Sequence, residues 1–110
     1  MTTHTQKIAH LNDILRITFT GGQVVMTPGI ASLPDHLRLQ VFDAVRSFKD
    51  FNKENDPYQE RDCATLEVEG VGSVTWKIDY YDPSEEFHSD DPSDPTITKR
   101  VLMIMLTHEY

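Results

Sequence analysis

The chain has 110 residues, of which 38% are hydrophobic and 25% are charged, a composition typical of one globular domain and unlike that of disordered or membrane-spanning proteins. Its 18 acidic and 10 basic residues give a formal net charge of -8, which disfavours direct nucleic-acid binding through phosphates and attachment to anionic membranes. We therefore expect a single domain over residues 1–110 whose favoured partners are basic protein surfaces or cationic ligands.

The amino-terminal segment and the single cysteine indicate a cytoplasmic protein. Residues 1–10 contain no apolar run long enough for a secretory signal, and the longest apolar stretch, residues 101–106, is too short to cross a membrane. Cys63 cannot form an intramolecular disulfide, which suits a reducing compartment. Its neighbour Asp62 would raise the pKa of the thiol, so we interpret Cys63 as a small buried residue rather than a nucleophile.

The first half of the chain predicts two helices separated by a short strand. Apolar residues at steps of three and four predict an amphipathic helix over residues 5–19, with Thr5 as its N-cap. β-Branched residues predict a strand over 23–26, which a turn at 27–29 ends. A second helix is expected from Pro34, a residue type favoured in the first helical turn. Its apolar face comprises Leu37, Val41, Ala44, Val45 and Phe48.

The second half of the chain predicts an antiparallel hairpin. Alternating apolar residues predict two strands within residues 64–81, joined by a glycine-containing turn. In the simplest register Lys77 lies opposite Glu67 or Glu69. The residues that this alternation points into the core include Trp76 and Tyr80.

Two acidic segments and a last strand complete the expected fold. Residues 52–62 and 82–95 lack periodicity and are predicted to be loops. The strand over 96–107 has a continuous apolar run, which favours burial on both faces and a central place in the sheet. Together these elements predict an α+β fold with two helices packed on one face of a three- or four-stranded, mainly antiparallel sheet. An exposed edge of the last strand would permit a homodimer, so monomer and homodimer both stay open.

Five sequence motifs resemble those of a known family in their order and spacing. They are Ile8-Ala-His-Leu-Asn-Asp-Ile-Leu-Arg16, Phe19-Thr-Gly-Gly-Gln-Val-Val-Met-Thr27, Asn55-Asp-Pro-Tyr58, Trp76-Lys-Ile-Asp-Tyr-Tyr-Asp82 and Arg100-Val-Leu-Met-Ile-Met-Leu106. The chain is similar to the uncharacterised bacterial family numbered 3768 among the domains of unknown function. This resemblance implies a single-domain bacterial protein of a kind often carried by plasmids and other mobile elements, and it implies no activity. Members have His-Asp-Phe-Gly where this chain has Arg61-Asp62-Cys63-Ala64, so no histidine role carries over.

Twelve of the 18 acidic residues lie in or beside the two predicted loops, which suggests an acidic contact surface. Both loops flank the hairpin, and complementary charge would attract a basic partner, although such loops are also often simply solvated. The predicted contact surface comprises Asp56, Tyr58, Glu60, Asp79, Tyr81, Asp82, Asp90, Asp91 and Asp94, because tyrosine is favoured in interfaces. We interpret the chain as a non-enzymatic protein-interaction module whose carboxylates could occupy the place of nucleic-acid phosphates on a basic protein.

The alternative is a small carboxylate-based or metal-dependent enzyme or ligand-binding domain. Asp79 and Asp82 leave the hairpin together and could act as an acid and a base. A pocket converging on Asp56, Asp79 and Asp82 would favour this alternative. The sequence contains no phosphate-binding glycine loop and none of the common hydrolase or metalloprotease motifs, so we assign no catalytic residue and no cofactor.

Metal binding has only weak sequence support. Asp50, Asn52 and Glu54 alternate as in a calcium loop, but Asn55 and Arg61 occupy the positions that require Gly and Glu. His88 has acidic neighbours but no partner at the spacing of a transition-metal site. We therefore assign no metal ligand.

Overall fold

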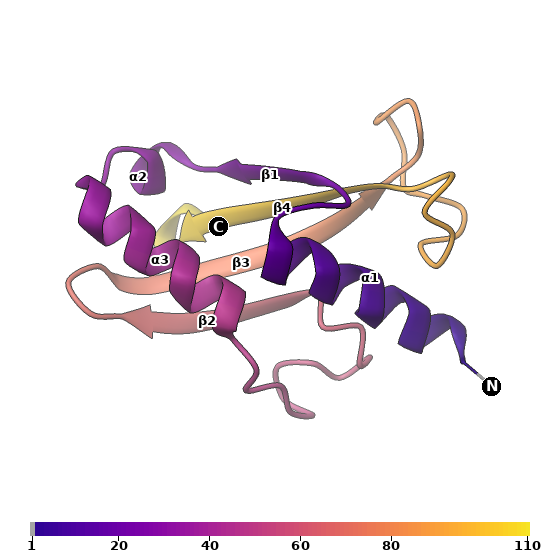
Figure 1. Ribbon diagram of the computed structural model, residues 1–110, viewed down its shortest axis with the longest axis horizontal. Helices are drawn as coiled ribbons and strands as arrows, with labels where there is room; N and C mark the ends of the chain where they lie inside the picture. The colour runs from indigo at the N-terminus through magenta and orange to yellow at the C-terminus, as the bar shows by residue number, and fades with distance from the viewer. Residues whose placement is uncertain (1) are drawn as a thin grey trace.

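The computed structural model describes residues 2–110, which form an α+β fold with three α-helices and a four-stranded sheet (Figure 1). The elements are α1 (His4–Thr18), β1 (Gln23–Met26), α2 (Pro28–Ala31), α3 (Asp35–Ser47), β2 (Cys63–Val68), β3 (Gly72–Tyr81), β4 (Lys99–Leu106) and a terminal 3₁₀ turn, η1 (Thr107–Glu109). The strand order is β1-β4-β3-β2, in which only the β1–β4 pair is parallel among the described strands. The predicted fold class and the central position of the last strand are both confirmed.

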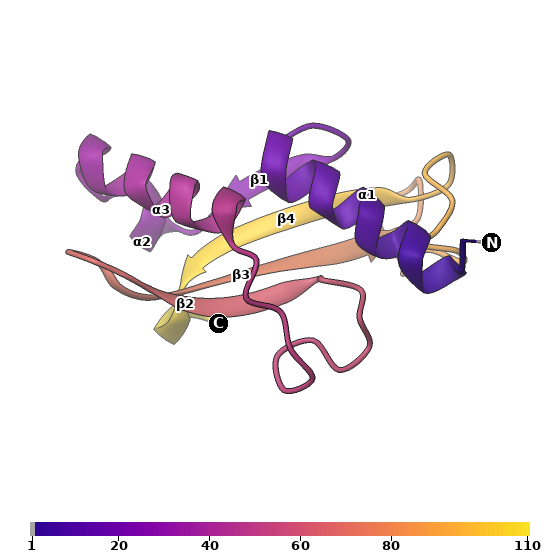
Figure 2. The ribbon, with the colours of Figure 1, turned by 60° about the horizontal axis from the view of Figure 1, so that its bottom comes forward.

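Helices α1 and α3 lie over the same face of the sheet (Figure 2). Leu15 of α1 and Val45 of α3 have no exposed surface, and neither have Trp76 of β3 and Ile104 of β4, with which they form one hydrophobic cluster. Burial of such side chains stabilises the fold by about 1.5–3 kcal/mol each. Tyr80 is also buried, so the predicted core positions of Trp76 and Tyr80 are confirmed.

The hairpin register differs from the expected one. The main-chain N–H of Val71 donates to the carbonyl of Val68 at 3.0 Å, and this tight turn pairs Val68 with Gly72. Lys77 consequently lies opposite Cys63, and the predicted pairing of Lys77 with Glu67 or Glu69 is wrong. The Lys77 ammonium instead binds the Asp79 carboxylate on its own strand at 2.9 Å.

The helix starts also differ in detail from the predictions. Thr3, not Thr5, is the N-cap of α1, because the Thr3 hydroxyl accepts the Gln6 N–H (3.1 Å) while the Gln6 side chain accepts the Thr3 N–H (2.9 Å). This reciprocal capping box satisfies two main-chain donors. Residues 28–31, expected to begin in a turn, form the short helix α2, and Pro34 occupies the N-cap of α3 rather than its first helical position.

Two properties of the surface complete the description. Cys63 is exposed, so the prediction that it is buried is wrong. Its side chain lies on the sheet face opposite the helices, and β2 is an edge strand. The pKa of its thiol is raised, by partial desolvation first and by the negative charge of Asp62 second, as predicted in direction. Within residues 2–110, no helix has both the length and the apolar character needed to cross a membrane.

Candidate functional site

A buried polar network holds both acidic loops against α1 and the sheet. The amide nitrogen of the fully buried Asn12 donates to the main-chain oxygen of Glu60 (3.0 Å) and to the Tyr80 hydroxyl (2.8 Å). That hydroxyl donates to the Glu60 carboxylate at 2.8 Å, and burial raises the pKa of Tyr80 well above its usual value. Arg100 donates from Nε to the Asn12 side-chain oxygen at 3.0 Å and from an Nη to the carbonyl of Pro92. Glu60 of the first acidic loop and Pro92 of the second are thereby bound to the core.

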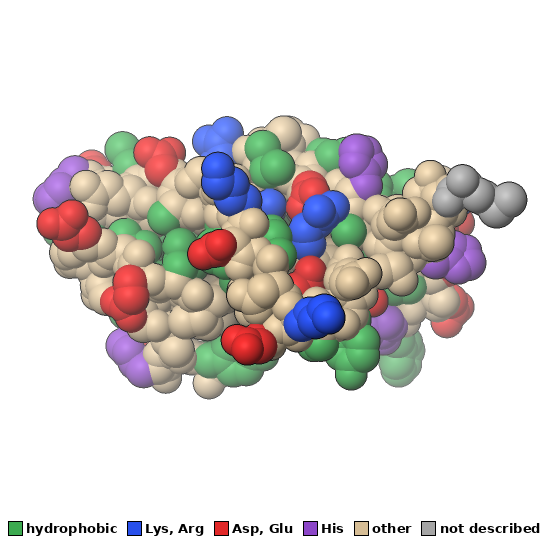
Figure 3. All heavy atoms as spheres, turned by 90° about the horizontal axis from the view of Figure 1, so that it is seen from below, with side chains coloured by type: hydrophobic (Ala, Val, Ile, Leu, Met, Phe, Trp, Pro, Cys, Tyr) green, Lys and Arg blue, Asp and Glu red, His purple; other side chains and the backbone are tan. Residues whose placement is uncertain are grey.

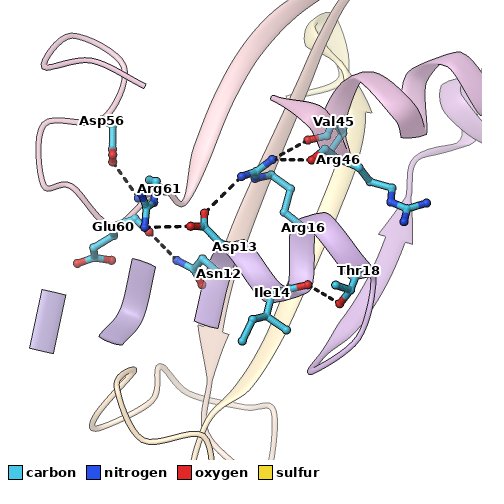
Figure 4. A network of polar contacts seen from close by, with 10 residues as sticks. All are labelled: Asn12, Asp13, Ile14, Arg16, Thr18, Val45, Arg46, Asp56, Glu60 and Arg61. Carbon is cyan, nitrogen blue, oxygen red and sulfur yellow. Dashed lines mark hydrogen bonds and ion pairs between the residues drawn. The ribbon is translucent and has the colours of Figure 1, made fainter. Parts of the chain in front are cut away.

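Further contacts order the segment 56–61 (Figure 4). The Asp56 carboxylate accepts the Arg61 main-chain N–H at 3.0 Å, and Asp56 is only 6% exposed. Asp13 of α1 binds the guanidinium of Arg61 with one oxygen (2.9 Å) and that of the buried Arg16 with the other (3.3 Å). Asp56 therefore has a structural role in its loop rather than a place on an exposed contact surface.

Three Asp-Pro-Ser or Asp-Pro-Thr tripeptides shape the loop over 82–95. In each, an aspartate oxygen accepts a hydrogen bond from the hydroxyl two residues later. The pairs are Asp82 with Ser84 (2.8 Å), Asp91 with Ser93 (2.6 Å) and Asp94 with Thr96 (2.6 Å). These hydroxyls, followed by main-chain N–H groups, lower the pKa values of Asp82 and Asp91. The three carboxylates thus stabilise the turns of their own loop.

Acidic residues from three separate segments line one hollow at the end of β3. Asp62, Asp79 and Glu86 line a hollow of about 290 Å³, which we call the acidic notch. Four residues with aromatic side chains also line it: Tyr80, Tyr81, Phe87 and His88. Phe87 is 68% exposed, so the notch combines negative charge with an accessible apolar surface.

The acidic notch lies along the edge of β3, just beyond the point where β2 begins beside it. β4 pairs with β3 as far as Tyr81, so the notch lies on the other side of β3. The main-chain oxygen of Asp62 accepts the N–H of Ile78 at 2.7 Å just before β2 begins. After β3 ends, the loop over 82–95 folds back, and His88 forms an antiparallel bridge with Tyr81. The notch is the space between the Asp62–Ile78 hydrogen bond and the Tyr81–His88 bridge. The positions of both contacts depend on how β3 pairs with its neighbours.

Negative charge accumulates around the notch. The pKa of Asp62 is raised, mainly by partial burial and further by the charges of Glu60, Asp56 and Asp79. Lys77 neutralises Asp79 in part through their 2.9 Å ion pair. Because like charges oppose one another's ionisation, a cation entering the notch would relieve this repulsion.

The structure does not gather the nine residues predicted from the sequence into one surface. Asp79 and Tyr81 line the acidic notch, and Glu60 contributes to its charge. Tyr58 is 81% exposed but lines a different hollow beside the start of α1. The exposed Asp90 has no side-chain hydrogen bond to any described residue, and Asp82, Asp91 and Asp94 hold their own loop.

The candidate metal and catalytic residues are not assembled into a site. Asn52 uses its side-chain oxygen to accept the main-chain N–H groups of Glu54 (2.9 Å) and Asn55 (3.0 Å), which explains the alternating pattern as a turn. No group of three or more His, Cys, Asp or Glu side chains over residues 2–110 is arranged to hold a metal ion. Asp79 and Asp56 line different hollows, so the pocket that would favour an enzyme is not formed between them.

The fold assembles a basic cluster that the sequence does not reveal. Arg16, Arg46, Lys49 and Arg61 line one hollow near the carboxyl ends of α1 and α3. Figure 3 shows Lys and Arg side chains gathered in the middle of one face of the molecule. These residues are far apart in sequence, so only the fold brings them together.

Comparisons with known proteins define a family for the chain. No curated protein and no solved structure matches it. A family match covers residues 26–109, beginning at the end of β1 and leaving α1 outside. The resemblance noted from the sequence motifs is confirmed over this range. The chain therefore belongs to the family described as Protein of unknown function (DUF3768).

Proposed function

We propose that the chain is a non-enzymatic protein-interaction module of the bacterial cytoplasm, and that its acidic notch receives an arginine or lysine side chain of a basic partner protein. The observation that carries this proposal is the convergence of Asp62, Asp79 and Glu86 from three segments on one hollow. The net charge of -8 favours encounter with a basic surface over long range.

The notch fits this role better than the acidic loops as a whole. Asp56 is buried, and Asp82, Asp91 and Asp94 bind hydroxyl groups within their own loop. The carboxylates of Asp62 and Glu86, by contrast, accept no hydrogen bond from another side chain over residues 2–110. Carboxylates without a structural partner keep their lone pairs for a ligand, so we place the contact surface at the notch.

The aromatic lining suits a long cationic side chain. Arginine and lysine carry apolar stems that pack against aromatic rings while their charged ends reach polar groups. Tyr81 is half-buried and Phe87 is 68% exposed, so both offer ring surface beside the carboxylates. Cation–π contacts of this type contribute about 0.5–1 kcal/mol at exposed sites.

The partner that this chemistry favours is a basic protein such as one that binds nucleic acid. The carboxylates of the notch, together with the exposed Glu85 and Asp90 of the same loop, would take the positions of phosphates in its basic groove. An accessory role of this kind on a mobile element would need neither a cofactor nor a catalytic residue.

The direct test measures binding of an arginine-rich peptide by isothermal titration calorimetry. The double variant Asp79→Asn with Glu86→Gln removes two notch charges. Asp43→Asn with Glu67→Gln removes two exposed charges elsewhere and serves as the matched control. Exposed charge pairs contribute about 0.2–1 kcal/mol each, so we expect the notch variant to weaken binding roughly 2- to 30-fold.

Two comparisons decide the outcome. The proposal requires the control variant to bind like the parent protein, and binding to weaken at roughly threefold higher salt as exposed charges are screened. Equal weakening by both double variants would show that only net charge matters, and the notch would then have no specific role.

A further inference from the structure

A second charged hollow, of opposite sign to the acidic notch, lies between the carboxyl ends of α1 and α3. Its volume is about 380 Å³. It is lined by Asp13, Arg16, Ile17, Arg46, Ser47, Phe48, Lys49, Phe51 and Arg61. Four of these side chains are cationic and one is anionic, although the whole chain has a net charge of -8. We call this feature the basic hollow.

The single acidic residue does not neutralise the basic hollow. Asp13 is shared by two guanidinium groups, with 3.3 Å to Arg16 and 2.9 Å to Arg61. The Nε atoms of Arg16 and Arg61 are buried and have no hydrogen-bond partner among residues 2–110. Burial lowers the pKa of Arg16 despite Asp13, and the charge of Arg61 lowers it further. Positive charge therefore remains in excess around these two side chains.

Part of this positive charge has a structural explanation. Arg16 donates to two carbonyls in the last turn of α3, both at 3.0 Å (Figure 4). Arg46 donates from Nε to the carbonyl of Ile17 at 2.8 Å. Cations at helix carboxyl ends interact favourably with the helix dipole. The dipoles account for the burial of Arg16 and the placement of Arg46, but they leave other donors unused.

The unused donors belong to Arg46 and Lys49. Across residues 2–110, neither side chain has a carboxylate within 4.0 Å, and Arg46 makes no other side-chain hydrogen bond than the one to Ile17. Arg46 and Lys49 are both exposed residues that line the basic hollow. Guanidinium and ammonium groups in this arrangement are the donors that oxyanions prefer.

The basic hollow is adjacent to a larger one. Phe51 and Arg61 also line the hollow of about 770 Å³ beside the start of α1, whose rim carries the exposed Tyr58. Small-molecule sites commonly have volumes of about 300–1,000 Å³ and combine apolar walls with a few polar groups.

We propose that the basic hollow binds the phosphate or carboxylate group of a small anionic ligand, held by Arg46, Lys49 and Arg61. Such a site is independent of the acidic notch, because the two hollows share no lining residue. The chain would then combine a surface for a basic protein with a pocket for an anion.

The test compares the thermal stabilisation of the protein by pyrophosphate, succinate and sodium chloride at equal ionic strength. A ligand that binds only the folded state raises the melting temperature, whereas screening alone acts equally for all three salts. Lys49→Glu reverses one charge at the rim, and Lys99→Glu makes the same change at another exposed site. An NMR titration of the main-chain amides of residues 47–49 provides a second readout of the same binding.

We expect pyrophosphate or succinate to stabilise the parent protein more than chloride does. Lys49→Glu should weaken that binding roughly 2- to 30-fold, and Lys99→Glu should leave it unchanged. The stronger of the two probes identifies a phosphate or a carboxylate as the natural group. Equal stabilisation by all three salts, or unchanged binding by Lys49→Glu, would overturn the proposal.

Discussion

Replacing Asn12 by alanine is the most severe perturbation of the network that positions both acidic loops. The side chain has no exposed surface and makes three hydrogen bonds, to the Glu60 carbonyl, the Tyr80 hydroxyl and Arg100 Nε. Asn12→Ala removes all three at once. The Tyr80 hydroxyl keeps the Glu60 carboxylate as its acceptor at 2.8 Å, so its loss is partial.

The expected cost follows from the partners left behind. Arg100 is 3% exposed, and a hydrogen bond to a charged group contributes about 1.5–3 kcal/mol. The Glu60 carbonyl loses a neutral hydrogen bond of about 1 kcal/mol. We therefore expect Asn12→Ala to lower the free energy of unfolding by about 3 kcal/mol, or the melting temperature by about 10–20 °C. This is a large fraction of the stability of a typical domain.

Urea denaturation followed by circular dichroism measures the loss directly. Gln40→Ala, an exposed change on α3, serves as control and should change the stability by less than about 0.5 kcal/mol. The double variant with Arg100→Met should cost less than the sum of the single changes, because both remove the same hydrogen bond. A loss below about 1 kcal/mol for Asn12→Ala, or strict additivity with Arg100→Met, would refute the reasoning.

Three further predictions concern the helix cap and two carboxylates. Thr3→Ala should lower the stability by about 1 kcal/mol in thermal denaturation, whereas Thr5→Ala should not, because only Thr3 caps α1. Asp62→Asn should stabilise the protein at pH 7, because folding raises the pKa of this carboxyl and so disfavours its charged form. That gain should shrink as the pH falls through the raised pKa, and disappear below the unfolded value of about 3.9; a gain that is constant with pH would contradict this. Glu109→Gln should destabilise at pH 7, because the Thr27 hydroxyl lowers the pKa of Glu109. This difference from the parent protein should vanish as the pH falls below about 4.3 and through the lowered pKa, and a difference that persists at low pH would be inconsistent with the contact.

Periodicity predicted the architecture because burial on one face dictates it. The helical pattern of Leu37 to Val45 and the alternation from Val74 to Tyr80 both correspond to elements that cover the same core. The cap of α1 was placed at the wrong threonine. Thr3 is followed three residues later by Gln6, which is the capping-box pattern, whereas Thr5 is followed by Ile8. That signal was present in the sequence.

The acid count predicted the charged loops but not the function of each carboxylate. The Asp-Pro-Ser and Asp-Pro-Thr tripeptides at 82–84, 91–93 and 94–96 are local signals for self-capping turns, so those three roles were readable from the sequence. That Asp62 and Glu86 line the same hollow could not be predicted from the sequence. It depends on the hairpin register and on the bridge between Tyr81 and His88.

The basic hollow had no sequence signal at all. Arg16 comes from α1, Arg46 and Lys49 from the end of α3 and the segment after it, and Arg61 from the following loop. Only the packing of α1 against α3 brings these charges together, and no local pattern encodes that packing. The net charge of the chain therefore indicates which partners it attracts over long range, but it does not give the charge of each local surface.

The measurement that tests the central claim most directly is an NMR titration of the labelled protein with the arginine-rich peptide. If the acidic notch is the contact site, the largest chemical-shift changes will fall on residues 79–81 and 86–88. The same peaks will respond less in the Asp79→Asn, Glu86→Gln variant. Shifts spread evenly over exposed acidic residues such as Asp43 and Glu67, or centred on another surface, would contradict the account.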